Sequence, residues 1–60
     1  MNVQNTKAIA RKVGLTVAQV NETARDLGID MNYRKDNRYW EITNRHEAKM
    51  FLQHLVEHNG

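Results

Sequence analysis

The chain has 60 residues, of which 40% are hydrophobic and 27% charged, and it contains neither cysteine nor proline. The lack of cysteine excludes a disulfide framework and a cysteine zinc site. No apolar run approaches the roughly 20 residues of a membrane span, and the first residues lack a signal peptide's apolar segment, so we expect a soluble, cytoplasmic protein without membrane contact. A domain this short buries only about 60% of its unfolded surface. We therefore expect a single domain over residues 1–60, ordered at about 5–58, and no enzymatic activity.

The charge balance is mildly basic. Nine Lys and Arg residues against seven Asp and Glu give a net charge of +2, and the isoelectric point is near 9.3. The excess lies in residues 1–29, with four basic and two acidic residues. An excess of this size does not by itself indicate nucleic-acid binding, so the placement of the basic residues decides its meaning.

Two helices joined by a tight turn are predicted first. The apolar residues Ile9, Ala10 and Val13 follow helical spacing over 6–13, Asn5 or Thr6 precedes them as a cap, and Gly14 ends the helix.

The second predicted helix, 16–27, has the clearest start signal. Thr16 and Gln19 have the spacing of a capping box, and Leu15 and Val20 that of a hydrophobic staple. Gly28 ends the helix. Its expected buried face consists of Val17, Val20, Ala24 and Leu27.

From Ile29 to Ile42 the apolar pattern alternates, which predicts a short hairpin with a polar turn at 34–38. We expect Asp36 and Asn37 to take the positive φ angles of this turn. A last amphipathic helix of about four turns follows, capped by Asn44 with Glu47 at its third position. Its expected apolar stripe consists of Ala48, Phe51, Leu52, Leu55 and Val56.

The order helix, turn, helix, hairpin, helix predicts a mostly α fold with a small β-hairpin, that is, a winged helix-turn-helix. The stretch from Ile9 to Val20 resembles the helix-turn-helix of the MerR-like and phage excisionase DNA-binding domains. The stretch from Asn37 to Ile42, followed by Glu47, Phe51 and Leu52, is similar to their wing and the helix behind it. The resemblance spans residues 6–56.

This resemblance implies that the second helix enters the major groove and that the hairpin grips the backbone or the minor groove. On the exposed side of that helix, Gln19 is suited to adenine and the Ala18 methyl to thymine, while Thr16 is placed to reach a phosphate at the helix start. Arg25 is a candidate for a phosphate or a guanine edge. The carboxylates of Glu22 and Asp26 argue against DNA, although Glu22 is also a candidate acceptor for cytosine.

Basic residues outside this helix complete the expected interface. The turn carries three of them, and we expect them to contact phosphate rather than to form only a solvated tip. Tyr33, Tyr39 and Trp40 are expected to form the core beneath the hairpin rather than to stack on bases. The candidate phosphate contacts are Lys7, Arg11, Lys12, Arg34, Lys35, Arg38 and Arg45.

Neither metal binding nor catalysis is expected. His54 and His58 have the i, i+4 spacing of two zinc ligands, but no cysteine joins them, and exposed helix histidines are the favoured interpretation. The chain has no serine and no Gly-rich phosphate loop, and we expect no cofactor.

Two functions from different classes remain open. The first is a small sequence-specific binder of double-stranded DNA, either an excisionase-like architectural factor in recombination or a compact transcriptional regulator, associated with the nucleoid or, if phage-encoded, in the host cytoplasm. Since one such domain offers only about 600–1,000 Å² of contact, we expect a homodimer, cooperative binding along DNA or a recombinase partner. The alternative is a protein-interaction module or small inhibitor that binds a host protein through the acidic face of helix 16–27.

Overall fold

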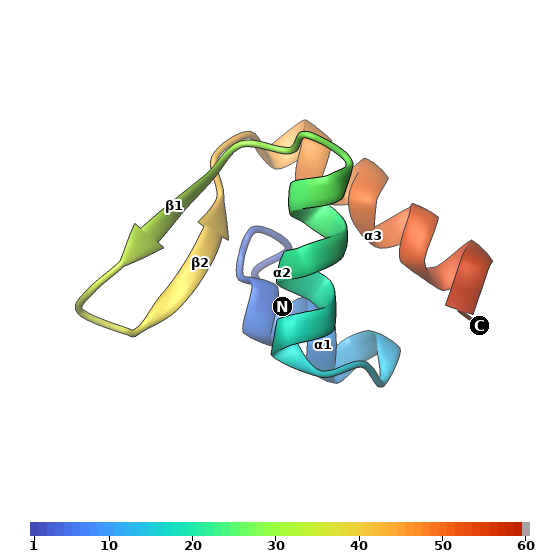
Figure 1. The fold of residues 1–60 in the computed structure, drawn as a ribbon, viewed down its shortest axis with the longest axis horizontal. Helices are drawn as coiled ribbons and strands as arrows, with labels where there is room; N and C mark the ends of the chain where they lie inside the picture. Colours follow the sequence, from blue (N-terminus) through green and yellow to red (C-terminus); the bar gives the residue numbers. More distant parts are fainter. Residues whose placement is uncertain (60) are drawn as a thin grey trace.

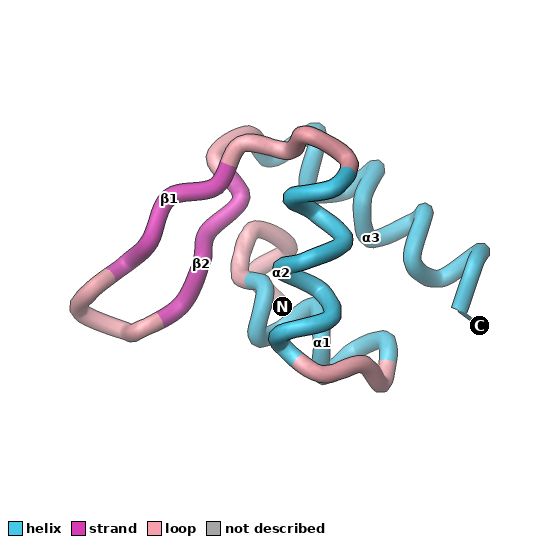
Figure 2. The backbone as a smooth tube through the Cα atoms, in the orientation of Figure 1, coloured by secondary structure: helices cyan, strands magenta, loops and turns pink. Residues whose placement is uncertain are grey.

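The computed structural model describes residues 1–59 and contains three helices and one two-stranded antiparallel hairpin (Figure 1). The hairpin projects to one side of the helices, and the last helix runs away to the other side (Figure 2). The predicted order of elements is confirmed. No helix within residues 1–59 is long and apolar enough to cross a membrane. The elements are α1 (Thr6–Val13), α2 (Val17–Asp26), β1 (Met31–Arg34), β2 (Tyr39–Ile42) and α3 (Arg45–Asn59).

Local signals fix the tight turn between α1 and α2. The Asn5 side chain caps α1 by accepting hydrogen bonds from the backbone N–H groups of Lys7 and Ala8. Gly14 has a φ of 75°, the left-handed conformation that ends the helix with little strain. The capping box predicted at Thr16 is present at the start of α2, so the two helices turn as the sequence indicates.

Side chains from all three helices and β2 meet in one small core. Val17, Leu27 and Val56 were expected to be buried, but their exposed fractions are 38%, 51% and 51%. Val17 and Leu27 lie at the two ends of α2, beyond the part that packs, and α3 packs through a narrower stripe than predicted. The buried cluster consists of Ile9, Ala10, Val20, Ala24, Ile42, Ala48, Phe51 and Leu55.

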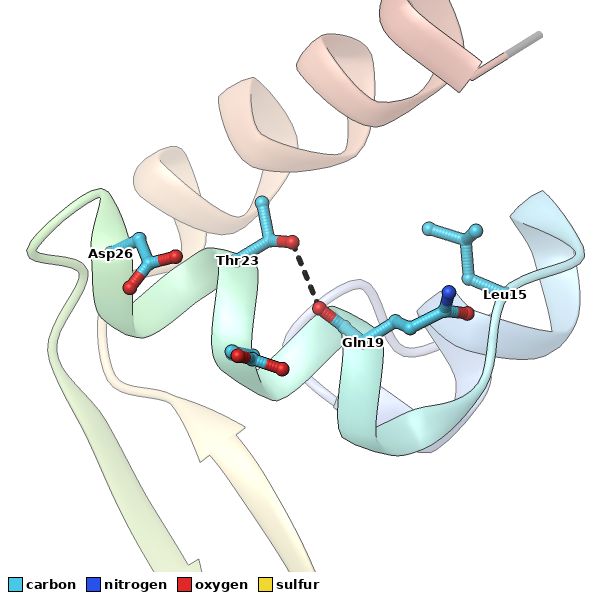
Figure 3. A pocket seen from close by; sticks show the side chains of 5 residues that line it. Leu15, Gln19, Thr23 and Asp26 are labelled. Carbon is cyan, nitrogen blue, oxygen red and sulfur yellow. Dashed lines mark hydrogen bonds between the residues drawn. The ribbon is translucent and has the colours of Figure 1, made fainter.

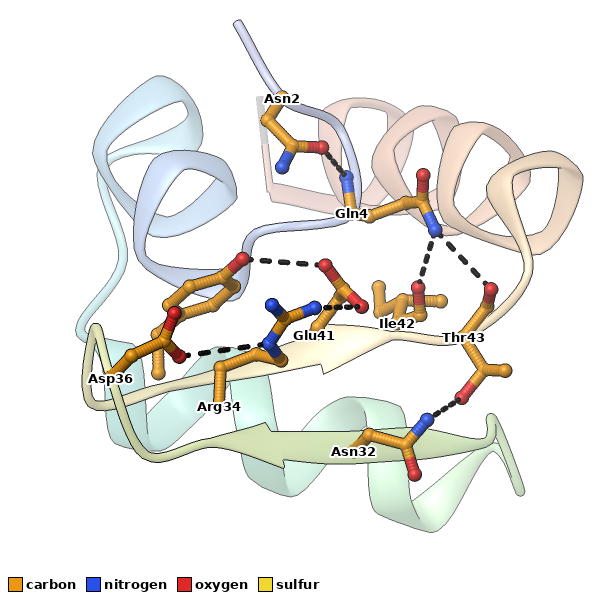
Figure 4. A network of polar contacts seen from close by, with 9 residues as sticks. Asn2, Gln4, Asn32, Arg34, Asp36, Glu41, Ile42 and Thr43 are labelled. Carbon is orange, nitrogen blue, oxygen red and sulfur yellow. Dashed lines mark hydrogen bonds and ion pairs between the residues drawn. The ribbon is translucent and has the colours of Figure 1, made fainter.

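The N-terminal segment pairs with the free edge of β2. The Ile42 N–H donates to the carbonyl oxygen of Gln4 at 2.7 Å, and Asn5 forms an antiparallel bridge with Glu41. The Gln4 side chain donates to the carbonyl oxygens of Ile42 and Thr43 at 2.9 and 3.2 Å (Figure 4). These bonds anchor the hairpin to the start of α1, an arrangement that the sequence pattern did not predict.

The hairpin tip, residues 35–38, connects the strands with a left-handed residue in an unexpected place. Arg38, not Asp36 or Asn37, has the positive φ of 52°. Arg38 is the last loop residue, where the chain must turn back into β2, so the loop geometry outweighs the preference of Asp and Asn for this conformation.

Candidate nucleic-acid interface

The exposed face of α2 has two flanks of different chemistry. On one flank, the guanidinium carbon of Arg25 lies 5.6 Å from the centre of the Trp40 ring on β2. Ala18 lies on the same side, because seven residues are close to two helical turns. We call this flank, defined by Ala18 and Arg25, the hairpin edge of α2.

The other flank borders a shallow hollow of about 200 Å³ (Figure 3). Measured around the helix axis from Arg25, Gln19 lies at about 120° and Asp26 at about 100° in the same direction. The carboxylate of Asp26 therefore lies away from the hairpin edge, together with Gln19. We call this feature the acidic hollow; it is lined by Leu15, Gln19, Glu22, Thr23 and Asp26.

At the start of α2, the polar groups that were expected to contact DNA bond to one another instead. The Gln19 side-chain oxygen accepts from the Thr16 N–H at 3.0 Å and from the Thr16 hydroxyl at 3.2 Å. The Thr16 hydroxyl in turn accepts from the Gln19 N–H at 3.1 Å. A paired hydrogen bond to adenine needs both the oxygen and the nitrogen of the Gln19 amide. Gln19 therefore has to leave the capping box before it can read adenine as expected.

The two faces of the hairpin also carry different side chains. Tyr33 is paired with Trp40 on the face toward α2, and Arg34 is paired with Tyr39 on the opposite face. On that opposite face the Arg34 guanidinium lies 3.4 Å from the Glu41 carboxylate and 3.7 Å from that of Asp36 (Figure 4). Arg34 therefore points away from α2, and its charge is largely compensated.

Tyr39 is the most buried aromatic ring of the hairpin. Burial, reinforced by the charge of Glu41 and a hydrogen bond to it, raises the pKa of the Tyr39 phenol above its ordinary value of 10.0. The hydroxyl donates to the Glu41 carboxylate at 3.3 Å. Tyr39 thus lies in the core as expected, whereas Tyr33 is 48% exposed and Trp40 half-buried. The strand register accounts for the difference in face, because Tyr33 lies opposite Trp40 on the face toward α2, whereas Tyr39 lies opposite Arg34 on the other face.

The hairpin tip brings basic residues from two elements together. Lys35 and Arg38 are exposed, and neither has a carboxylate partner among residues 1–59. Lys7 of α1 reaches the tip, where its ammonium group lies 3.5 Å from the Asn37 carbonyl oxygen. Arg11 follows Lys7 by one helical turn and continues the basic surface along α1.

Two further basic residues lie outside this cluster. Lys12 lies about 140° around α1 from Lys7, whereas Arg11 lies about 40° from it; both also line a hollow of about 370 Å³ with Met1 and Ala8. Arg45 begins α3 at the opposite end of β2 from the tip, and four strand residues separate these ends by roughly 13 Å. The cluster at the tip therefore contains Lys7, Lys35 and Arg38, but not Arg45.

The histidines of α3 do not complete a metal site within the described chain. The rings of His54 and His58 lie 4.3 Å apart. Among residues 1–59, no three His, Cys, Asp or Glu side chains come together as metal ligands would.

Comparisons of the chain with known protein families, curated proteins and solved structures found no match.

Proposed function

We propose that this protein binds double-stranded DNA as a winged helix-turn-helix domain, with α1 and α2 as the helix-turn-helix unit and the hairpin as the wing. The observation that carries the proposal is the cationic cluster of Lys7, Lys35 and Arg38, none of which forms an ion pair within residues 1–59. Basic side chains that neutralise phosphates supply most of the sequence-independent affinity for DNA. The proposal includes the resemblance of the sequence to MerR-like and excisionase DNA-binding domains.

The distribution of carboxylates supports it. Asp36 and Glu41 interact with Arg34 on the hairpin face away from α2. Asp26 lines the acidic hollow. The surface from the hairpin edge of α2 to the tip therefore keeps its positive charge, and Asp26 weighs less against DNA than the sequence indicated.

On this surface, α2 has few groups free to read bases. Ala18 presents a methyl group that suits thymine, and Arg25 presents N–H donors. The first N–H groups of the helix, at Val17 and Ala18, have no acceptor within the helix and suit a phosphate. We infer that backbone contacts dominate affinity and that α2 contributes a modest selectivity.

A salt titration tests the proposal. The wild-type protein is titrated with mixed-sequence duplex DNA at several salt concentrations, and the logarithm of the binding constant is plotted against that of the salt concentration. Contacts from Lys7, Arg11, Arg25, Lys35 and Arg38 to five phosphates predict a slope of about −4.5. Binding that is absent at low salt would overturn the proposal.

A double variant locates the interface. Lys35→Ala with Arg38→Asn removes both positive charges of the tip, and Asn tolerates the left-handed backbone of residue 38. The slope should become less steep by about 1.8 units, which corresponds to roughly a sixtyfold loss of affinity at 0.1 M salt. Lys49→Ala removes one exposed charge from α3 and is the control, since it should leave the slope unchanged.

The acidic hollow supports a second candidate function. It offers the carboxylates of Glu22 and Asp26 beside Leu15, a combination suited to a basic side chain with an apolar stem from another protein. Glu22→Gln with Asp26→Asn separates the two functions. If the protein binds DNA, this double variant keeps or gains DNA affinity; if it binds a basic protein surface through the hollow, it loses that partner.

A further inference from the structure

Arg25 does not pair with Glu22, the nearest carboxylate residue on the same face of its own helix. Glu22 precedes it by three residues, a spacing at which oppositely charged side chains usually meet on a helix. Within residues 1–59, however, Arg25 forms no ion pair, and its guanidinium lies over the Trp40 ring instead. The hairpin, rather than α2 itself, therefore determines where this charge points.

Trp40 is a firmly held platform. Its carbonyl oxygen accepts a 2.9 Å hydrogen bond from the hydroxyl of Thr6, which is fully buried. Its strand is paired with β1 on one edge and with the N-terminal segment on the other. The Tyr33 ring lies against the indole at 5.3 Å between centroids. Trp40 is thus anchored by its strand and its neighbours, whereas Arg25 reaches it from an exposed position on α2.

A contact with the ring leaves the hydrogen-bonding edge of Arg25 available. A guanidinium group is planar and carries its five N–H donors in that plane. The contact with the indole ring uses none of these donors, and Arg25 itself is exposed. The same ring contact restricts the rotation of a long side chain, so less conformational freedom is lost when an anion binds.

We propose that Trp40 is a positioning residue, which holds Arg25 so that its N–H edge contacts a phosphate of the DNA strand that passes between α2 and the hairpin. This inference depends on the proposed function and sharpens it. A phosphate is the expected ligand, because Arg25 leans from the outward side of α2 toward the hairpin, where the backbone beside the groove would run. A base edge would instead be met by the outward side of α2, where Glu22 lies about 60° around the helix from Arg25.

The test uses charge-changing and charge-conserving variants on several unrelated duplexes. Arg25→Ala should make the salt slope less steep by about 0.9 units and lower affinity about eightfold at 0.1 M salt, equally for every sequence. Trp40→Leu keeps every charge, yet it should lower affinity by a similar factor. The double variant should lose no more than either single variant, as expected for two residues that act together. Trp40→Phe keeps an aromatic face and should retain most of the affinity.

A second measurement avoids the risk that Trp40→Leu disturbs folding. Trp40 is the only tryptophan in the chain, so tryptophan fluorescence reports on the surroundings of this one ring. Emission should change when DNA is added to the wild type, and Arg25→Ala, which leaves Trp40 in place, should abolish that change. A residue with a merely structural role would alter thermal stability without altering the salt slope or this signal.

The outcomes separate the inference from the function on which it rests. If the wild type fails to bind DNA, both are overturned. If the tip variants weaken binding but Arg25→Ala or a folded Trp40→Leu leaves it unchanged, only the role of Trp40 and Arg25 is overturned. If Arg25→Ala weakens binding to some sequences and not others, Arg25 reads a base, and the phosphate assignment is wrong.

Discussion

The exposed face of α2 and the hairpin tip both carry polar side chains, but those side chains are used differently. On α2, Thr16 and Gln19 bond to one another, and the Thr23 hydroxyl donates to the Gln19 carbonyl oxygen at 2.8 Å. At the tip, Lys35 and Arg38 are exposed without a carboxylate partner in the described part of the chain. Side chains that stabilise their own helix are less free to bind a ligand, whereas the tip offers charge without such a cost.

This difference suggests a division of labour under the proposed function. The tip, together with Lys7, would attract any duplex, because phosphate contacts carry no sequence information. The hairpin edge of α2 would add what selectivity the protein has. Variants that change the charge of one region and leave the other intact test this difference in role.

Charge reversal at the tip should have the largest effect. Lys7→Glu with Lys35→Glu changes two exposed residues, so thermal stability should fall little, but it replaces two attractive charges with two repulsive ones. We expect DNA affinity at 0.1 M salt to fall by more than the roughly sixtyfold predicted for losing two phosphate contacts. Fluorescence anisotropy with a labelled duplex measures the loss, and a fall of less than about tenfold would contradict the role of the tip.

Adjacent positions on α2 provide a matched pair for the next prediction. Ala18→Glu and Gln19→Glu introduce the same charge in the first turn of α2, where the helix dipole stabilises a carboxylate. Glu at position 19 also keeps a capping-box residue. Ala18→Glu, on the hairpin edge, should lower DNA affinity at least tenfold, whereas Gln19→Glu, beside the acidic hollow, should lower it only about twofold through screened repulsion.

The reverse ranking would overturn the geometry proposed for α2. It would show that the flank carrying Gln19 faces DNA, and hence that the capping box opens on binding. Circular dichroism melts of both variants provide the control, since both should unfold within a few degrees of the wild type.

The sequence predicted the parts of the fold that local chemistry decides. Asn5, Gly14 and Thr16 act where expected, because caps and left-handed turns depend on residues a few positions apart. The burial of Val17 and Leu27 was predicted wrongly, because a periodic pattern does not reveal how much of a helix another element covers.

The candidate site was less predictable, because it depends on where the hairpin lies relative to α2. Helical projection placed Gln19 and Arg25 together on one exposed face. Only the position of Trp40 shows that Arg25 leans to one side and Gln19 to the other. The ion pair of Arg34 with Glu41 was likewise not predictable, because it depends on the register of the two strands.

Neutralising Arg34 should have a much smaller effect on DNA binding than neutralising its neighbour in the tip. The Arg34 charge is opposed by Asp36 and Glu41 and lies on the hairpin face away from α2. Arg34→Ala should therefore lower affinity less than about twofold, whereas Arg38→Asn should lower it about eightfold at 0.1 M salt. Equal losses from the two variants would show that Arg34 leaves its carboxylate partners to bind DNA.

Tyr39 provides a test of the same network that needs no DNA. Its pKa is raised above 10.0 by burial, then by the charge and hydrogen bond of Glu41, and is lowered in part by Arg34. The native state therefore keeps the phenol proton at a pH where the unfolded chain has lost it, so stability is fully present below about pH 10 and declines as the pH rises through the native pKa. In a Tyr33→Phe background, where Tyr39 is the only phenol, ultraviolet titration should show this raised pKa. Adding Arg34→Ala should raise it further, because a neighbouring positive charge is removed; an unchanged or lower pKa would mean that Arg34 does not lie beside this network in solution.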